Sequence, residues 1–159
     1  MDTTNLNAIG LNKEDGIAIS KQLNKLLSNY QIFYMNLRGF HWNIKGKNFF
    51  ELHLIFEELY NDALIKVDEI AERILTLGEA PIHTFSKYID SSEIKSTENV
   101  FDGDLAIGSI LENLKTLLSI ERKILKKASE IDDEGTVSLM SDYITQQEKL
   151  IWMLSAYQN

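Results

Sequence analysis

The chain of 159 residues contains no cysteine and a single proline, and it has no long apolar run. Without cysteine there can be no disulfide framework, no thiolate metal site and no cysteine nucleophile. Neither a basic-then-apolar leader nor a run of about 18 apolar residues is present, which argues against secretion and membrane insertion. We therefore expect a cytoplasmic protein. With 44% hydrophobic residues, residues 1–159 are expected to form a single domain with a substantial core.

Clusters of basic residues are also missing. The formal net charge is −8, the first twenty residues contain only Lys13 among the basic types, and the sequence closes on Gln158-Asn159. Binding DNA without reading its bases requires clustered Lys and Arg that displace counterions. We therefore expect no appreciable DNA affinity.

The dominant pattern is helical, and it is clearest in the second of two consecutive helices. The first helix is expected from about residue 15 to 43. In the second, apolar residues recur at three- and four-residue steps: Leu52, Phe56, Leu59, Ala63, Val67, Ile70 and Ile74. Asn48 and Glu51 have the spacing of an N-cap with a capping-box carboxylate, and Gly78 and Pro81 supply the stop.

The remaining residues predict two further long helices after a polar crossover. Residues 78–101 form the crossover, in which 84–89 could make a short extra helix. A third helix is marked by apolar residues from Leu105 to Ala128, and a fourth, after Asp132-Asp133, by those from Val137 to Tyr157. The sequence therefore predicts an all-α fold, a ferritin-like four-helix bundle with a long crossover between helices two and three.

Four ligand-type side chains lie on the first two helices: His41, His53, Asp68 and Glu72. His53 precedes Asp68 by fifteen residues, which at about 1.5 Å per residue is about 22 Å, far longer than metal–ligand bonds of about 2 Å. The short connection at Gly46 makes the two helices antiparallel and brings His41 and His53 to one level. One chain can therefore pair its histidines, but its carboxylates cannot join them.

A second copy of the chain would remove this difficulty. If the second helix crosses its symmetry mate antiparallel near Asn61 and Asp62, the histidine end of one copy meets the carboxylate end of the other. One flank of this helix mixes apolar and ligand-type residues, which suggests a partner surface. The members of this flank are Phe50, His53, Leu64, Asp68, Ala71 and Glu72. We therefore expect a two-fold dimer with two identical shared sites.

Two plainer readings remain open at this point. Carboxylate pairs at this spacing are common on solvated helix faces, where Glu72 could simply pair with a Lys or Arg. A histidine beside a core stripe is often just a packed or hydrogen-bonded residue. Position alone leaves the question open.

Further information comes from the residues that surround these four positions. The relevant segments are Phe40-His41-Trp42-Asn43, Lys45-Gly46-Lys47-Asn48-Phe49-Phe50, Leu52-His53, Phe56-Glu57-Glu58-Leu59-Tyr60, Val67-Asp68-Glu69-Ile70-Ala71-Glu72-Arg73 and Glu148-Lys149-Leu150-Ile151-Trp152-Met153-Leu154. Together they resemble the Dps family of mini-ferritins, strongly over residues 30–80 and by helix pattern elsewhere. The resemblance implies a hollow dodecamer with an iron-oxidising site at each dimer interface.

The same resemblance implies a function for the four ligand-type residues. Positions matching His41 and His53 of one chain and Asp68 and Glu72 of its two-fold mate bind Fe²⁺, which is oxidised, preferentially by H₂O₂, and stored as ferric mineral. Imidazole with carboxylate is a ligand set that iron, zinc or manganese accepts, and carboxylate charge favours the ferric product. We therefore expect a ferroxidase and iron store that protects against oxidative damage.

Accessory roles follow from the resemblance too. Trp42 could quench oxidising equivalents, although packing is the commoner role of such an aromatic. Glu57 and Glu58 could nucleate mineral or simply face solvent. Asp132 and Asp133 could line entry pores or cap the fourth helix.

Other functions must be weighed against this one. Di-iron bundles that hold metal inside one chain use Glu-x-x-His motifs. The residues three positions before the histidines of this chain are Arg38, Phe50 and Ala80, so an intrachain centre of that type is missing; His83, in the crossover, is assigned a surface role. The alternatives are a nucleoid-compacting DNA-binding protein, which the acidic composition disfavours, and a metal-free structural oligomer.

Overall fold

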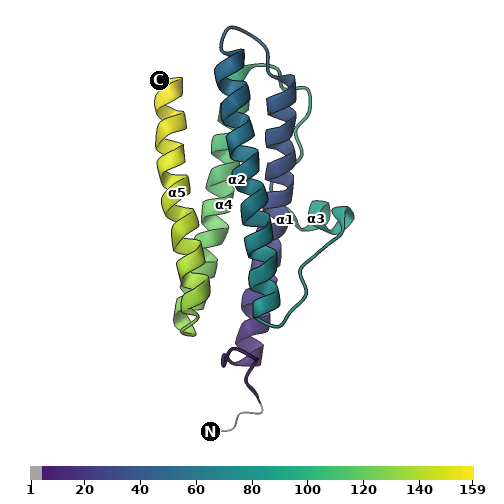
Figure 1. Cartoon of the computed structure of the whole chain (residues 1–159), viewed down its shortest axis with the longest axis vertical. Coiled ribbons are helices and arrows are strands. Elements are labelled where there is room, and N and C mark those ends of the chain that lie inside the picture. Colours follow the sequence, from purple (N-terminus) through teal and green to yellow (C-terminus); the bar gives the residue numbers. More distant parts are fainter. Residues whose placement is uncertain (1–4) are drawn as a thin grey trace.

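The computed structural model describes residues 5–159, which form four long helices and one short helix (Figure 1). The helices are α1 (Lys13–Asn43), α2 (Phe49–Thr76), α3 (Phe85–Ser91), α4 (Gly103–Glu130) and α5 (Glu134–Gln158). The long helices lie side by side in a bundle, and α3 stands on the crossover beside α1. No strand occurs within residues 5–159. The predicted all-α bundle with a long crossover between its second and third long helices is confirmed.

The helix ends agree with the predicted ones to within a few residues. Helix α1 begins at Lys13, because Asn12 caps it by accepting hydrogen bonds from the backbone N–H groups of Glu14 and Asp15. Helix α2 ends before Gly78, whose φ of 97° only glycine adopts readily. Among residues 5–159 no helix is long and apolar enough to cross a membrane.

The predicted capping box at the start of α2 is wrong. Asn48 occupies the N-cap position, but its side chain makes no capping hydrogen bond. Its φ of −99° and ψ of 19° differ from the extended backbone that side-chain capping requires. The turn is instead closed by the backbone, since the Phe49 N–H donates to the Gly46 carbonyl at 3.1 Å.

Apolar side chains from all four long helices form the core. The largest fully buried ones are Tyr30, Phe56, Ile19, Leu23, Leu26, Leu27, Leu37, Ile70, Ile74, Ile107, Ile110 and Leu114. Most of the predicted stripe on α2 is among the buried residues: Leu52, Phe56, Ala63, Ile70 and Ile74. Helix α1 packs along α2, and α4 along α5. The core therefore fixes how α1 and α2 sit against each other.

Asparagine side chains of α1 hold the crossover against the bundle. The Asn24 side chain accepts a hydrogen bond from the Ile82 N–H at 2.8 Å. Further along, Asn29 accepts from the Ile94 N–H at 3.0 Å, and Asn36 from the Thr97 N–H at 3.0 Å. These side-chain oxygens bond backbone N–H groups of the crossover that have no partner within a helix. They therefore hold the crossover against α1.

Candidate functional site

The α1–α2 turn brings two imidazoles together. His41 lies near the end of α1 and His53 in the first turns of α2. Their rings stack with centroids 3.7 Å apart and an angle of 15° between the planes. The predicted pairing of the two histidines within one chain is therefore confirmed.

Reciprocal hydrogen bonds orient the two rings. His41 Nδ1 lies 2.6 Å from the His53 backbone oxygen, and His53 Nδ1 lies 2.7 Å from the His41 backbone oxygen. A carbonyl oxygen only accepts, so each Nδ1 must carry the proton. In the neutral imidazole this leaves the lone pair on Nε2, which becomes the atom available to a metal ion.

Aromatic side chains surround the imidazole pair. Phe49 stacks on His53 at 5.0 Å, and the Tyr60 ring meets His41 nearly at a right angle, at 5.2 Å. His41 is only 7% exposed. These contacts restrict rotation of both imidazoles and therefore keep the two Nε2 atoms in a fixed arrangement.

The guanidinium of Arg38 covers the aromatic side chains next to the histidines. It lies 4.6 Å from the ring centroid of Tyr60 and 4.9 Å from that of Trp42. Trp42 itself is 58% exposed. A cation over an aromatic ring opposes positive charge on that ring, so Arg38 makes a radical cation on Trp42 harder to form.

The two carboxylates do not lie with the histidines. Asp68 and Glu72 are exposed on α2, and within residues 5–159 neither forms an ion pair. In the same part of the chain no three His, Asp or Glu side chains lie close enough to hold a metal ion. The alternative in which Glu72 pairs with a Lys or Arg of its own chain is therefore not what the structure shows.

Large apolar side chains accompany these carboxylates on the surface of α2. Phe50 is 82% exposed and Leu64 50% exposed. Both share the helix flank of His53, Asp68 and Glu72, since residues four, eleven or eighteen positions apart lie on nearly the same side of an α-helix. We call this surface the α2 flank. Large exposed apolar side chains along one flank of a helix suggest a surface that contacts a partner.

Two predicted accessory residues are placed differently from each other. Asp132 is exposed, with a φ of 60°. Asp133 is buried, caps α5 by accepting the Thr136 N–H at 3.1 Å, and pairs with Arg73 at 2.6 Å. Its carboxylate therefore serves as the helix cap and is unavailable to line a pore.

Of the acids proposed for mineral nucleation, one is half-buried and one is exposed. Glu57 accepts a long hydrogen bond from the Tyr60 hydroxyl, at 3.5 Å, and Glu58 faces outward. Nothing in these contacts distinguishes nucleation from an ordinary solvated face, so their role stays a prediction. His83, in the crossover, is exposed, and its Nδ1 lies 3.0 Å from the Pro81 carbonyl.

Sequence reasoning missed a polar cluster at the centre of the bundle. Tyr30 donates to the carboxylate of Glu121 at 2.7 Å, and Gln147 donates to the same oxygen at 2.7 Å. Burial raises the pKa of Glu121 to about 7, although these hydrogen bonds and the charge of Lys66 lower it. A signal was present, because Glu121 interrupts the apolar stripe between Leu117 and Ile124.

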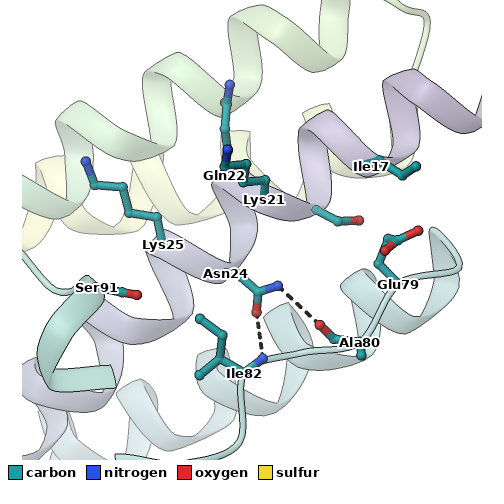
Figure 2. A pocket seen from close by; sticks show the side chains of 10 residues that line it. Ile17, Lys21, Gln22, Asn24, Lys25, Glu79, Ala80, Ile82 and Ser91 are labelled. Atoms are coloured by element: carbon teal, nitrogen blue, oxygen red, sulfur yellow. Dashed lines mark hydrogen bonds between the residues drawn. The ribbon is translucent and has the colours of Figure 1, made fainter. Parts of the chain in front are cut away.

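A large hollow lies away from the histidines. It measures about 720 Å³ and lies between the first half of α1, the segment after α2 and the end of α3 (Figure 2). The Asn24 side chain lies in it and bonds the backbone of Ala80 and Ile82. None of the four ligand-type residues lines it, so it is separate from the candidate metal site.

Comparisons with known proteins agree with the fold. The family model of the ferritin-like domain matches residues 20–159. The DNA protection during starvation protein of Porphyromonas gingivalis is 42% identical over 152 residues, covering 96% of each chain. DNA protection during starvation protein 2 of Bacillus anthracis is 36% identical over 137 residues, covering 86% of this chain and 94% of its own.

Solved structures show the same similarity. The crystal structure of a Dps protein from Vibrio cholerae O1 matches all of both chains at 48% identity, with a TM-score of 0.97. It is described as a member of a broad superfamily of ferritin-like diiron-carboxylate proteins. A Dps protein from Bacillus brevis is 32% identical, with a TM-score of 0.89 over 92% of this chain and 98% of its own.

Proposed function

Because the chain belongs to the Dps family of mini-ferritins, we propose that it is a ferroxidase and iron store. It binds Fe²⁺ at sites shared between two subunits and oxidises it, preferentially with H₂O₂. The ferric product is stored inside a hollow oligomer, which protects the cell from oxidative damage. His41 and His53 of one chain and Asp68 and Glu72 of its two-fold mate form each site.

The observation that carries this proposal is the locked imidazole pair. Both Nδ1 atoms are committed to carbonyl oxygens, at 2.6 and 2.7 Å, so both Nε2 atoms are free to bind Fe²⁺. With both Nδ1 atoms committed, the lone pair of each neutral ring lies on Nε2, where a metal ion could bind it. The arrangement therefore supports ligation.

The two-fold arrangement is supported by what the α2 flank exposes. Asp68 and Glu72 lack ion-pair partners within residues 5–159, and two apolar side chains of the same flank, Leu64 and Phe50, are exposed. An antiparallel crossing of two α2 helices near Asn61 would cover these apolar side chains. It would also bring the carboxylates of one subunit to the imidazoles of the other.

The ligand chemistry suits oxidation of Fe²⁺. Two imidazoles and two carboxylates give a mixed nitrogen and oxygen set, and the carboxylate charge stabilises Fe³⁺ more than Fe²⁺. Each H₂O₂ takes one electron from each of two Fe²⁺ ions and, with two protons, gives two water molecules and two Fe³⁺ ions. Metal binding needs neutral imidazoles, so affinity for Fe²⁺ should fall in acid.

Storage requires a closed shell of subunits. The expected assembly is the dodecamer of two-fold dimers that the family resemblance implies. Exposed apolar side chains outside the α2 flank, such as Phe85 on α3 and Trp152 on α5, are available for further contacts between subunits. Size-exclusion chromatography with light scattering tests this part of the proposal.

An iron assay tests the activity itself. The purified assembly is loaded anaerobically with Fe²⁺ and then mixed with H₂O₂ or with O₂. The proposal expects about two Fe²⁺ oxidised per H₂O₂, faster oxidation with H₂O₂ than with O₂, and iron that stays with the protein on a sizing column. An assembly that takes up no iron would indicate the metal-free structural oligomer.

DNA compaction is the alternative function, since relatives of this chain are named DNA protection proteins. Non-specific DNA binding scales with the number of phosphates that Lys and Arg neutralise. With 24 acidic against 16 basic residues, this chain repels a polyanion. We expect no band shift with duplex DNA at physiological salt, and a shift under those conditions would favour the alternative.

A further inference from the structure

The two imidazoles of the proposed iron site belong to a continuous series of ring contacts. His53 stacks on His41, and the ring of Tyr60, on α2, meets His41 nearly at a right angle with centroids 5.2 Å apart. Tyr34, on α1, meets Tyr60 in turn, with centroids 6.1 Å apart and an angle of 89° between the planes. An oxidisable phenol therefore lies in direct contact with one of the proposed metal ligands.

The Tyr60 hydroxyl has a carboxylate within reach. It donates to Glu57 Oε1, one turn earlier on α2, at 3.5 Å. Glu57 is half-buried and forms no ion pair within residues 5–159. A tyrosine that gives up an electron also releases its phenolic proton, which needs an acceptor. A carboxylate at this distance can serve, because the hydrogen bonds of catalytic bases are often long before the substrate binds and then tighten.

The hydroxyl of Tyr34 has a different partner. It accepts a hydrogen bond from the Arg38 guanidinium at 3.0 Å. In the part of the chain that the structure describes, no carboxylate accepts the proton of this hydroxyl. Of the two tyrosines in contact with each other, only Tyr60 therefore has a base for its proton.

The guanidinium of Arg38 distinguishes Tyr60 from Trp42 as an electron donor. It lies 4.6 Å from the ring centroid of Tyr60 and 4.9 Å from that of Trp42. An indole that loses one electron becomes a cation, which the nearby positive charge opposes. A phenol that loses an electron together with its proton becomes a neutral radical, which that charge does not oppose. These contacts therefore favour oxidation of Tyr60 over oxidation of Trp42.

We propose that Tyr60 is an electron donor of the iron site, that Glu57 takes its proton, and that Arg38 keeps Trp42 from being oxidised in its place. This inference rests on the ferroxidase function proposed above and extends it. It concerns a site that holds only one Fe²⁺ when it meets H₂O₂. Such a site has one electron from iron, whereas complete reduction of H₂O₂ takes two.

The electrons and protons of the step balance as follows. H₂O₂ takes one electron from Fe²⁺ and the second from Tyr60, and its O–O bond breaks. Two water molecules form with two protons, one of them the phenolic proton that Glu57 passes on and the other from solvent. The remaining products are Fe³⁺ and the neutral Tyr60 radical. A second Fe²⁺ that arrives later, together with one proton, returns the radical to tyrosine, so the total stays at two Fe²⁺ per H₂O₂.

The test uses the intact assembly, loaded anaerobically with one Fe²⁺ per site and frozen within milliseconds of mixing with H₂O₂. Electron paramagnetic resonance should show a radical whose signal narrows in protein made with ring-deuterated tyrosine. In a parallel sample, mass spectrometry should find the adduct of a nitroso spin trap on Tyr60. A second Fe²⁺ added before freezing should remove the signal. Radical yields are expressed per Fe³⁺ formed, so a change in iron oxidation alone does not alter them.

Two phenylalanine variants assign the radical. Tyr60→Phe keeps the ring against His41 but has no phenol, so it should lose the signal and release hydroxyl radical to a soluble spin trap. Tyr34→Phe removes the hydroxyl from the neighbouring ring and is the matched control, which should keep the signal. If Tyr60→Phe does not assemble, the narrowed signal and the mapped adduct of the wild type still decide the inference.

Two further variants test the base and the cation. Glu57→Gln should slow radical formation at least about tenfold, since a positioned base contributes about 10²- to 10⁴-fold in rate. Arg38→Met should move part of the spin-trap adduct to Trp42, a change that a merely structural role of Arg38 would not produce. A Glu57→Gln assembly that forms the radical at the wild-type rate would overturn the proton transfer, and an Arg38→Met assembly without adduct on Trp42 would overturn the role of Arg38.

The remaining outcomes separate this inference from the function on which it rests. Wild-type protein that oxidises two Fe²⁺ per H₂O₂ when both ions are present, but forms no tyrosyl radical with one, would overturn the inference and leave the ferroxidase standing. A signal that persists in Tyr60→Phe, or an adduct on Trp42 in the wild type, would also overturn it. No oxidation of Fe²⁺ at either loading would overturn the proposed function, and this inference with it.

Discussion

His41 and His53 hold each other in place, since each Nδ1 lies within 2.7 Å of the other residue's backbone oxygen. The two hydrogen bonds tie the end of α1 to the start of α2, across a turn of only five residues, 44–48. The imidazoles are therefore already positioned in the absence of metal, so the proposed binding of Fe²⁺ would need little reordering of side chains. The consequences can be measured.

Removing one imidazole should abolish most of the activity. His53→Ala removes one Nε2 ligand and also releases His41, which loses both its stacking partner and a tight contact around its ring. We expect the rate of Fe²⁺ oxidation by H₂O₂ to fall at least about tenfold, since loss even of groups that orient metal ligands costs about 10- to 100-fold. His83→Ala, in the exposed crossover, is the control and should keep the wild-type rate.

Charging the α2 flank should separate the subunits. Leu64 is half exposed and lies close to the predicted two-fold axis near Asn61. Leu64→Lys should place two ammonium groups across the axis, and light scattering should show a shift toward the 18.2 kDa monomer. Iron oxidation should be lost although all four ligand residues remain. Ser119→Lys, exposed on α4, is the control; an intact and active Leu64→Lys assembly would contradict the dimer.

Neutralising Glu121 should stabilise the protein at alkaline pH. Well below pH 4.5, the ordinary pKa of a glutamate, this carboxyl is protonated in both the folded and the unfolded chain. As the pH rises toward 7, the unfolded chain releases the proton first, because burial raises the folded pKa to about 7. The free energy of unfolding therefore falls as the pH rises from about 4.5 to about 7, by about 3 kcal/mol in total. Glu121 causes no further loss above this range.

The variant Glu121→Gln removes this dependence. Its amide keeps an oxygen for Tyr30 and Gln147 and adds an N–H that can serve the unmatched Gln147 Oε1. The melting temperature at equal protein concentration should exceed that of the wild type at pH 8 and approach it at pH 5. A variant that is equally destabilised at both values would contradict this expectation, because the carboxyl group would then be needed whatever its charge.

Local pattern was enough to predict the helices and the histidine pair. Periodic apolar residues such as Leu52, Phe56 and Ile70 identify the buried face of α2. The short turn between two antiparallel helices places His41 and His53 at the same level, where their rings stack. The predicted helix boundaries lie close to the observed ones for the same reason. The predicted capping by Asn48 fails because it requires an extended backbone at that residue, which the spacing of residues does not reveal.

Long-range contacts could not be predicted in the same way. Asp133 is a buried partner of Arg73, sixty residues earlier, and only the packing of α5 against α2 brings them together. The central cluster joins Tyr30, Glu121 and Gln147 from three different helices, each of which looks like an isolated polar residue in its own segment. That Asp68 and Glu72 of a second chain complete the histidine site stays a prediction, because no contact within one chain can test it.

The most direct test of a site shared between subunits is complementation of two inactive variants. One is His41→Gln/His53→Gln, and the other is Asp68→Asn/Glu72→Gln; each alone should oxidise Fe²⁺ with H₂O₂ at no more than background rate. When both chains are co-expressed and assemble at random, about a quarter of the wild-type sites should be intact, because a mixed dimer rebuilds one of its two sites. The predicted result is therefore about a quarter of the wild-type rate in the mixed assembly. A mixed assembly as inactive as either variant alone would contradict the shared site.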